Sequence, residues 1–407
     1  MPRLRPISFL VVLALVLCLG GAAPAAAEET LEVLDGRGGG GGRITAAVAT
    51  DVAAVRRGDE TWVFYGANTG DGHDLRLARL GDDGTATFRT LDGAGTRAGR
   101  TTHDVGADVS AVAHDGVVHV FYVDATEEDL RHAWRAPGAT WRFGTVDGHA
   151  GDAGRTLADV GALSTAVVYR GQLQVFYVDE TEADIRRAVF DGSSWRVATI
   201  DGHTTLNDRT TEPLGDGLAA AVWGSRLHVL YTGATYEAGL REVVFSAGAS
   251  PSFTRLRQTD GGLVSILRLS RTEIYGAFED FSHVRPIRWR DGAWRISFPT
   301  WDTQSGATGM SVFADAGRPH IALGQFIGYG SGGSDEYVAV APWQPWRRWD
   351  ATFEAFWWSF PPGAPNAAVT VDGIGHLFVG GFGNDIGGSG GPALVRIIGS
   401  FEGQEPF

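Results

Sequence analysis

The strongest constraint on the fold is a phrase that the chain repeats. Residues 121–134 read FYVDATEEDLRHAW and residues 176–190 read FYVDETEADIRRAVF, and the phrase recurs at Phe64 and, more weakly, at Leu230. Strand-like segments also end on a regular series of Asp-Gly and then Trp-Asp pairs, 42 to 59 residues apart, at Asp35, Asp92, Asp147, Asp201, Asp260, Asp302 and Asp350. Repeats of about 40–50 residues with four strands each are typical of β-propeller blades. The sequence therefore predicts an all-β fold, a seven-bladed β-propeller of four-stranded blades.

One unit can be divided into its four strands. Residues 107–113 have small side chains that suit a crowded inner strand, and residues 117–123 are apolar enough for a strand covered on both faces. Residues 130–134 and 140–148 complete the sheet. Aromatic residues that recur once per unit are expected in the core, namely Phe121, Tyr122, Trp141 and Trp195.

The two ends of the chain predict how the ring closes. Arg3 and Arg5 precede an apolar run and then small residues, which is the pattern of a secretory signal peptide over residues 1–27. Residues 28–407 are then the propeller, and the protein is expected to be secreted, or periplasmic if the source has an outer membrane. Residues 29–36 resemble the end of an outer strand, whereas the last unit lacks one. We expect the first strand to complete the last blade, because an exposed sheet edge invites aggregation.

Charge and composition exclude several classes of protein. The formal net charge is −14, which argues against nucleic acid as a partner, because phosphate binding needs a basic surface. No second long apolar run follows the signal, so no membrane span is expected. Cys18 is the only cysteine and lies in the signal. No cofactor is predicted, although Ca²⁺ stays an option at the oxygen-rich residues 68–74 or at Asp335 and Glu336.

We call the seven aspartates that end the strand-like segments the anchors of the repeat. An arginine stands eight residues after each of the first four anchors, at Arg43, Arg100, Arg155 and Arg209. These arginines lie in the loops from the outer strand of one unit to the inner strand of the next. The loops between the second and third strands leave the same face and carry acids. One interpretation is that each arginine clamps an acid or a backbone carbonyl between neighbouring blades. The other is a ring of guanidinium groups that binds an anionic ligand.

The last two units carry a cluster of aromatic residues on the same face. Trp343, Trp346, Trp349, Trp357 and Trp358 fall within sixteen residues, and long glycine-rich loops emerge nearby. Trp343 and Trp349 are expected in the core. Rigid aromatic planes beside polar groups are what a sugar site requires. We therefore predict a ligand site made of Phe356, Trp357, Trp358, Asn384 and Asp385, together with the four loop arginines.

Residues 45–260 resemble the repeat of fucose-binding, fungal-type lectin propellers and related bacterial lectins, on the strength of VVHVFYVDATEEDLRHAW and LQVFYVDETEADIRRAVF. In that family an arginine on the second strand and a glutamate on the third strand hold the sugar. The matching positions here are His119 with His132, Gln174 with Arg187, and His228 with Glu242. The resemblance implies a propeller fold and glycan binding, and Glu242 is the one carboxylate retained at these positions.

The predicted function is binding of a carbohydrate or cell-surface polymer without catalysis, over units 6, 7 and 1; a protein partner is a further option. The alternative is an exported glycoside hydrolase or polysaccharide lyase that uses carboxylates at the mouth of the central channel. A retaining or inverting hydrolase needs two carboxylates facing one bond. The catalytic acids of such an enzyme would lie where the central channel of the propeller opens on the face of the long loops. The candidates are Glu127, Asp129, Glu279, Asp280, Glu354 and Asp385. No pair among them can be chosen from sequence.

Overall fold

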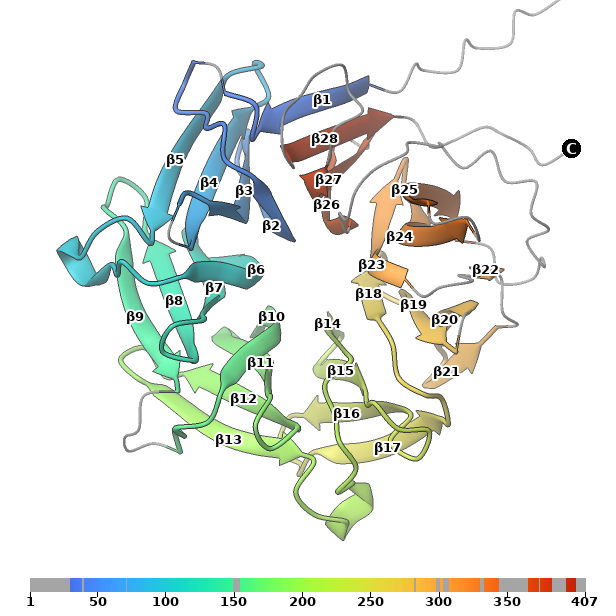
Figure 1. Cartoon of the computed structure of the whole chain (residues 1–407). Helices are drawn as coiled ribbons and strands as arrows, with labels where there is room; N and C mark the ends of the chain where they lie inside the picture. The colour runs from blue at the N-terminus through green and yellow to red at the C-terminus, as the bar shows by residue number, and fades with distance from the viewer. Residues whose placement is uncertain are drawn as a thin grey trace, which may run out of the picture.

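The computed structural model describes most of the chain from residue 30 onwards. The described ranges are 30–38, 40–70, 72–148, 154–281, 283–297, 301–302, 307–329, 333–343, 365–372, 374–382 and 393–399. The described residues form seven antiparallel sheets around a common axis (Figure 1). We number them in chain order as sheets 1 to 7.

Sheets 1 to 4 each contain four strands in sequence order from the axis outwards. Sheet 1 consists of β2 (Val48–Arg57), β3 (Glu60–Asn68), β4 (His73–Gly81) and β5 (Ala86–Asp92). Sheet 2 consists of β6 (Val105–His114), β7 (Val117–Asp124), β8 (Asp129–Arg135) and β9 (Arg142–Asp147). Sheet 3 consists of β10 (Val160–Tyr169), β11 (Gln172–Asp179), β12 (Asp184–Phe190) and β13 (Trp195–Asp201). Sheet 4 consists of β14 (Gly217–Trp223), β15 (Arg226–Thr232), β16 (Leu240–Ser246) and β17 (Ser252–Arg257).

Sheets 5 to 7 are less regular. Sheet 5 consists of β18 (Val264–Arg268), β19 (Ile274–Asp280), β20 (His283–Arg290) and β21 (Ala293–Ile296), and the short β22 (Trp301–Asp302) also pairs with β20. Sheet 6 has three described strands, β23 (Ala307–Asp315), β24 (Arg318–Tyr329) and β25 (Gly333–Pro342). Sheet 7 consists of β26 (Pro365–Val371), β27 (Ile374–Phe382), β28 (Ala393–Gly399) and β1 (Thr30–Asp35). Two short 3-10 helices, η1 (Arg97–Gly99) and η2 (Leu206–Asp208), lie in loops.

The β-propeller fold with four-stranded antiparallel blades is confirmed, but the prediction of seven four-stranded blades needs correction. Six of the described sheets have four strands or more, and sheet 6 has three. The fourth strand of that unit was expected before Asp350, and residues 344–364 lie outside the described part of the chain. The periodic anchor therefore predicted the fold better than it predicted the number of complete blades.

The middle strands are covered on both faces, as their apolar sequence predicted. In β7, Val120 and Tyr122 pack into a cluster with residues of sheet 1, whereas Phe121 points the other way into a cluster with sheet 3. This follows from the alternation of side chains along a strand. The predicted core residues Phe121, Tyr122, Trp141 and Trp195 are all buried, and so is Trp343. Trp349 lies outside the described residues.

The first and last strands of the described residues pair with each other. β1 runs antiparallel to β28, from Thr30 opposite Ile398 to Asp35 opposite Leu394. The Nε of Arg396 donates a hydrogen bond to Glu32 at 2.9 Å across this pair. Figure 1 shows β1 at the outer side of sheet 7, next to sheet 1.

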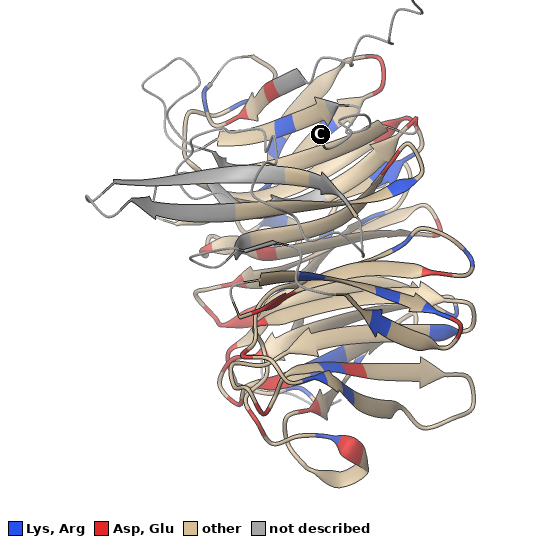
Figure 2. Cartoon of the chain, turned by 90° about the vertical axis from the view of Figure 1, so that its right-hand side faces the viewer, with Lys and Arg blue, Asp and Glu red and all other residues tan. Residues whose placement is uncertain are grey.

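The loops that follow the outer strands meet the loops between the second and third strands, as predicted. Asp104, before β6, donates its N–H to the hydroxyl of Thr126 at 3.1 Å, and Asp159 does the same to Thr181 at 3.0 Å. Figure 2 shows the strands running across the ring, with loops at both of its faces and acidic residues in many of them.

Candidate functional site

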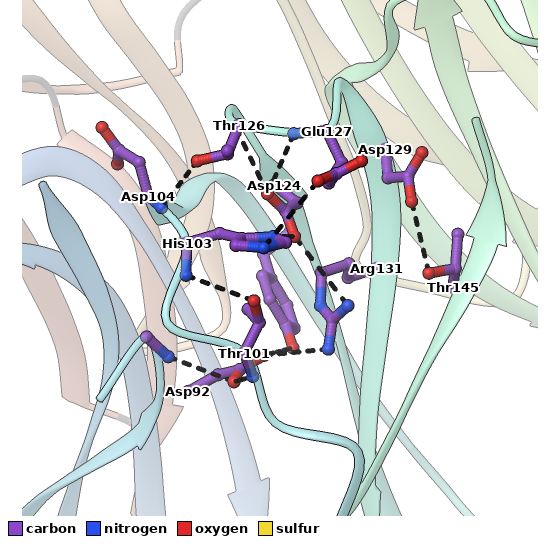
Figure 3. Close-up of polar contacts among 12 residues, drawn as sticks. Asp92, Thr101, His103, Asp104, Asp124, Thr126, Glu127, Asp129, Arg131 and Thr145 are labelled. Carbon is purple, nitrogen blue, oxygen red and sulfur yellow. Dashed lines mark hydrogen bonds and ion pairs between the residues drawn. The ribbon is translucent and has the colours of Figure 1, made fainter. Parts of the chain in front are cut away.

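Each junction between the first sheets is fastened by one buried aspartate, the anchor of the repeat. At the junction of sheets 1 and 2, Asp92 accepts the hydroxyl of Tyr122 at 2.7 Å and lies 3.3 Å from the guanidinium of Arg131 (Figure 3). Its other oxygen accepts the backbone N–H of Thr101 at 2.7 Å. Asp35, Asp147 and Asp201 repeat this arrangement with the matching Tyr and Arg side chains, namely Tyr65 and Arg76, Tyr177 and Arg186, and Tyr231 and Arg241. Burial first, and the adjacent carboxylate second, raise the pKa of Tyr122 well above its usual value.

The glycine that follows three of the anchors, at Gly93, Gly148 and Gly202, is required by close packing. Gly93 has φ of 100°, and a Cβ there would lie 2.1 Å from the carboxylate of Asp74. Gly148 and Gly202 stand in the same relation to Asp129 and Asp184. Only glycine adopts this backbone without strain and leaves room for the carboxylate. The Asp-Gly pairs that mark the repeat are therefore structural.

Three of the four loop arginines, Arg43, Arg155 and Arg209, contact the outer strands of sheets. The Nε of Arg43 donates to the carbonyl of Leu34 at 2.7 Å, and its guanidinium stacks on Phe88. Arg155 donates to the carbonyl of Thr145 at 3.3 Å. Arg209 stacks on Phe253 with its carbon centre 4.7 Å from the ring. Arg100 is half-buried. These contacts join sheets, and ligand binding by these arginines stays a prediction.

The aromatic part of the predicted site cannot be placed. Phe356, Trp357, Trp358, Asn384 and Asp385 all lie outside the described residues, as does Glu354. Their grouping into a ligand site stays a prediction.

The other acids proposed for the channel mouth do not form one group. Glu127 is exposed and lies 3.8 Å from His103, whereas Asp129 is buried (Figure 3). Asp280 is buried between two arginines, with Arg257 at 2.9 Å. In the part of the chain that is described, no three His, Cys, Asp or Glu side chains are close enough to hold a metal ion.

A pocket of about 410 Å³ opens between sheets 4 and 5. Its wall on sheet 4 comes from β16 and β17, including Glu242, Ser252 and Thr254. The opposite wall is formed by Trp289 on β20 and Trp294 on β21, with Arg226 also in the lining. A pocket of this size, with aromatic walls and a few polar groups, has the character of a small-ligand site.

Glu242 is held at the pocket by two hydrogen bonds to the same oxygen. Its Oε1 accepts the Nδ1–H of His228 at 2.6 Å and the indole N–H of Trp294 at 2.8 Å. His228 comes from the neighbouring strand β15, and Trp294 belongs to the next sheet. No hydrogen bond from the described residues reaches the second oxygen, Oε2. One oxygen thus fixes the carboxyl group, and the other can accept from a ligand.

The indole rings around Glu242 are fixed by contacts with one another. Trp289 and Trp294 pack edge to face with centroids 5.6 Å apart, and Trp223 meets Trp289 in the same way at 6.1 Å. The ring of His228 lies 4.6 Å from Trp289. These contacts orient the aromatic wall before a ligand arrives, and such preorganisation favours affinity.

The equivalent positions in sheets 2 and 3 are occupied by side chains that bond to each other. His119 and His132 are buried, 2.9 Å apart, and His132 is stacked between Phe121 and Trp134. Burial lowers the pKa of His119 to about 4, with a smaller contribution from His114.

In sheet 3, Arg187 donates twice to Gln174, at 2.9 and 3.1 Å, and stacks on Phe245. The position that keeps a carboxylate, in sheet 4, is the one that lines the 410 Å³ pocket.

Glu242 was noted from the sequence as the carboxylate retained in the resemblance to the fucose lectins, but neither Glu242 nor the aromatic wall of this pocket was included in the predicted site. Trp289, Trp294 and Arg226 were not among the predicted site residues. The signal available was the segment WRDGAW at residues 289–294, whose two tryptophans lie at the end of β20 and on β21. Their meeting with Glu242 depends on how sheets 4 and 5 pack.

A separate pair of carboxylates lies on the inner strands. Asp51 on β2 accepts the backbone N–H of Asp108 on β6, and Asp108 in turn accepts the N–H of Leu163 on β10. Burial first, and then the charge of Asp51, raise the pKa of Asp108 to about 7. Sequence reasoning did not single out this pair, because both residues stand inside expected strands.

Comparisons with known proteins give structural neighbours only. No protein family matches the chain, and no curated protein matches it. It is similar to Aleuria aurantia lectin, a fungal lectin with a six-bladed β-propeller fold and a novel fucose recognition mode, at 14% identity and a TM-score of 0.45 over 76% of this chain and 98% of that one. AofleA from Arthrobotrys oligospora is 12% identical, with a TM-score of 0.44, over 78% and 90% of the two chains.

An α-L-arabinofuranosidase from Lactobacillus brevis is 11% identical, with a TM-score of 0.38, over 58% of this chain and 90% of that one. The resemblance to fucose-lectin propellers that the sequence predicted is thus found among solved structures, as a similarity of structure at low identity. Over the described residues, no helix has the length and apolar character needed to cross a bilayer.

Proposed function

We propose that this protein binds carbohydrate, without catalysis, in the pocket between sheets 4 and 5. The observation that supports this most directly is Glu242, whose Oε1 is fixed by His228 and Trp294 while its Oε2 carries no bond from the described residues. This site differs from the predicted one over units 6, 7 and 1.

The chemistry of the pocket suits a sugar ring. A carboxylate oxygen accepts hydrogen bonds from hydroxyl groups, and such charge-assisted bonds are the stronger ones. The hydroxyls of Ser252 and Thr254 and the guanidinium of Arg226 add polar groups on the sheet 4 side. The electron-rich face of Trp294, the less buried of the two indoles, suits the weakly positive C–H face of a pyranose.

The test is a glycan array followed by titration of the best-binding free sugar. We expect Glu242→Gln to weaken binding by about 10- to 100-fold, because hydrogen bonds to a charged group contribute about 1.5–3 kcal/mol. Gln has nearly the same shape and can still accept from His228 and Trp294. Trp294→Phe, which keeps a ring but removes the N–H, should lose less affinity than Trp294→Ala.

The matched control is Glu128→Gln, at an exposed glutamate in a loop of sheet 2, which should bind as the unmodified protein does. Unchanged affinity in Glu242→Gln would refute the site. Release of reducing ends, measured in parallel, would favour the hydrolase or lyase alternative instead. Repeating the titration with EDTA and with added Ca²⁺ tests the calcium option.

We further propose that the protein is exported and that β1 closes a seven-bladed ring. The pairing of β1 with β28 and the signal-like residues 1–27 support this. The secreted protein should have the mass of residues 28–407. Removing residues 28–36 should lower the melting temperature and promote aggregation, because it uncovers the edge of β28. A truncated protein as stable and monomeric as the full one would contradict the closure.

A further inference from the structure

A second pocket, of about 680 Å³, lies on the other side of the same sheet. It is formed where the loop around η2 meets β17, and its lining includes Thr205, Thr211, Phe253 and Arg255. Both pockets fall within the range of about 300–1,000 Å³ that is usual for small-molecule sites.

The register of β16 and β17 shows how the two pockets are related. Glu242 pairs with Thr254, and both line the pocket between sheets 4 and 5. Arg241 pairs with Arg255, and both line the second pocket. Successive residues of a strand point to opposite faces of the sheet. The two pockets therefore lie on opposite faces of sheet 4, with β17 between them.

Only one strand, β17, separates the two pockets. It is the outermost strand of sheet 4, and its exposed Thr254 lines both pockets (Figure 1). An outermost strand leaves alternate backbone N–H and C=O groups unpaired along its edge. A polar ligand that crosses the edge at Thr254 would thus find hydrogen-bonding groups between the pockets.

The charges of both pockets are balanced. The first contains Arg226 and Glu242. The second contains three arginines and three acids, namely Arg209, Arg241, Arg255, Asp208, Glu212 and Glu237. Neither pocket is lined by an excess of positive or of negative side chains. A charged ligand is therefore not favoured, since recognition of ions relies on complementary charge. A neutral ligand rich in hydroxyl groups fits both.

We propose that the ligand is a neutral oligosaccharide that runs from the pocket between sheets 4 and 5, over Thr254, into the pocket beside η2. This inference rests on the proposed function, because it assumes that the first pocket holds a sugar. The second pocket then binds the additional sugar units of a longer oligosaccharide, so that affinity depends on the length of the oligosaccharide.

The test is a length series of cello-, xylo-, malto- and chito-oligosaccharides of one to six residues, titrated into the full-length mature protein. For the series that binds, affinity should rise by about 10-fold or more beyond the first sugar, since each added hydrogen bond contributes about 0.5–1.5 kcal/mol. Two variants probe the second pocket. Arg255→Ala removes a polar group, and Thr211→Trp fills the pocket from an exposed loop position.

Both variants should lose the gain with length while they bind the monosaccharide as the unmodified protein does. Arg196→Ala, at an exposed arginine on the outer strand of sheet 3, is the matched control. If the monosaccharide binds and length adds nothing, the extension is wrong and the single-pocket function stands. If length matters but neither variant changes it, the extension runs elsewhere and this proposal is wrong. If no sugar of any length binds, both proposals fail.

Discussion

Asp92→Ala is expected to lower the free energy of unfolding by about 2–4 kcal/mol, because it removes one partner of a buried ion pair and the acceptor of two further hydrogen bonds. Arg131 is buried and would lose its partner on sheet 1, and Asp124 at 3.8 Å would remain as its ion-pair partner. The hydroxyl of Tyr122 and the N–H of Thr101 would lose their acceptors as well (Figure 3). The measurement is a urea unfolding curve at neutral pH.

The control for this prediction is Asp82→Ala, which breaks an ion pair with Arg56 at the surface. The loss in the free energy of unfolding should be much smaller for Asp82→Ala, because exposed ion pairs contribute little to stability. A double-mutant cycle of Asp92→Ala with Tyr122→Phe should show coupling between the two sites, since they share a hydrogen bond. Equal effects of Asp92→Ala and Asp82→Ala would mean that the anchor does not fasten the sheets.

The anchors show how far the sequence could predict this fold. The regular Asp-Gly pairs correctly located the ends of the outer strands β5, β9 and β13. Their partners also recur at a fixed offset, because Tyr122 stands 30 residues after Asp92 and Tyr177 stands 30 residues after Asp147. That offset is a usable signal. In sheet 5 the fourth strand is split, because β21 and the short β22, which ends at the anchor Asp302, share one partner strand.

The candidate site was less predictable because it lies between units. A repeat shows which positions correspond, and the resemblance to the fucose lectins marked Glu242 as the one carboxylate among them. It does not show whether the neighbouring sheet fills the space in front of that position. His132 and Arg187 occupy the matching positions and bond within their own sheets, whereas Trp294, 52 residues from Glu242, completes the pocket from the next one. Side-chain volume across a sheet junction is a property of packing, which the pattern of one unit does not contain.

Asp108→Asn is expected to make the protein more stable at pH 8 and to flatten its stability between pH 4 and pH 7. The pKa of Asp108 is raised from 3.8 to about 7, first by burial and then by the charge of Asp51. The folded state therefore binds more protons than the unfolded state between these pH values. The free energy of unfolding should fall as the pH rises through this window and level off above pH 7, with a total cost of at most about 4 kcal/mol.

Asparagine suits this position because Asp108 has φ of 48°, a region that Asn tolerates, and because its amide oxygen can still accept the N–H of Leu163. Asp115→Asn is the matched control, since Asp115 has φ of 49° but is exposed. Urea unfolding at pH 4.5, 6 and 8 should show a stabilisation for Asp108→Asn that grows with pH, and none for Asp115→Asn. If the unmodified protein and Asp108→Asn depend on pH identically, then Asp108 is ionised without cost in the folded state. In that case the carboxylate of Asp108 would be stabilised by its hydrogen bonds as well as by water, and the pair with Asp51 would not make stability depend on pH.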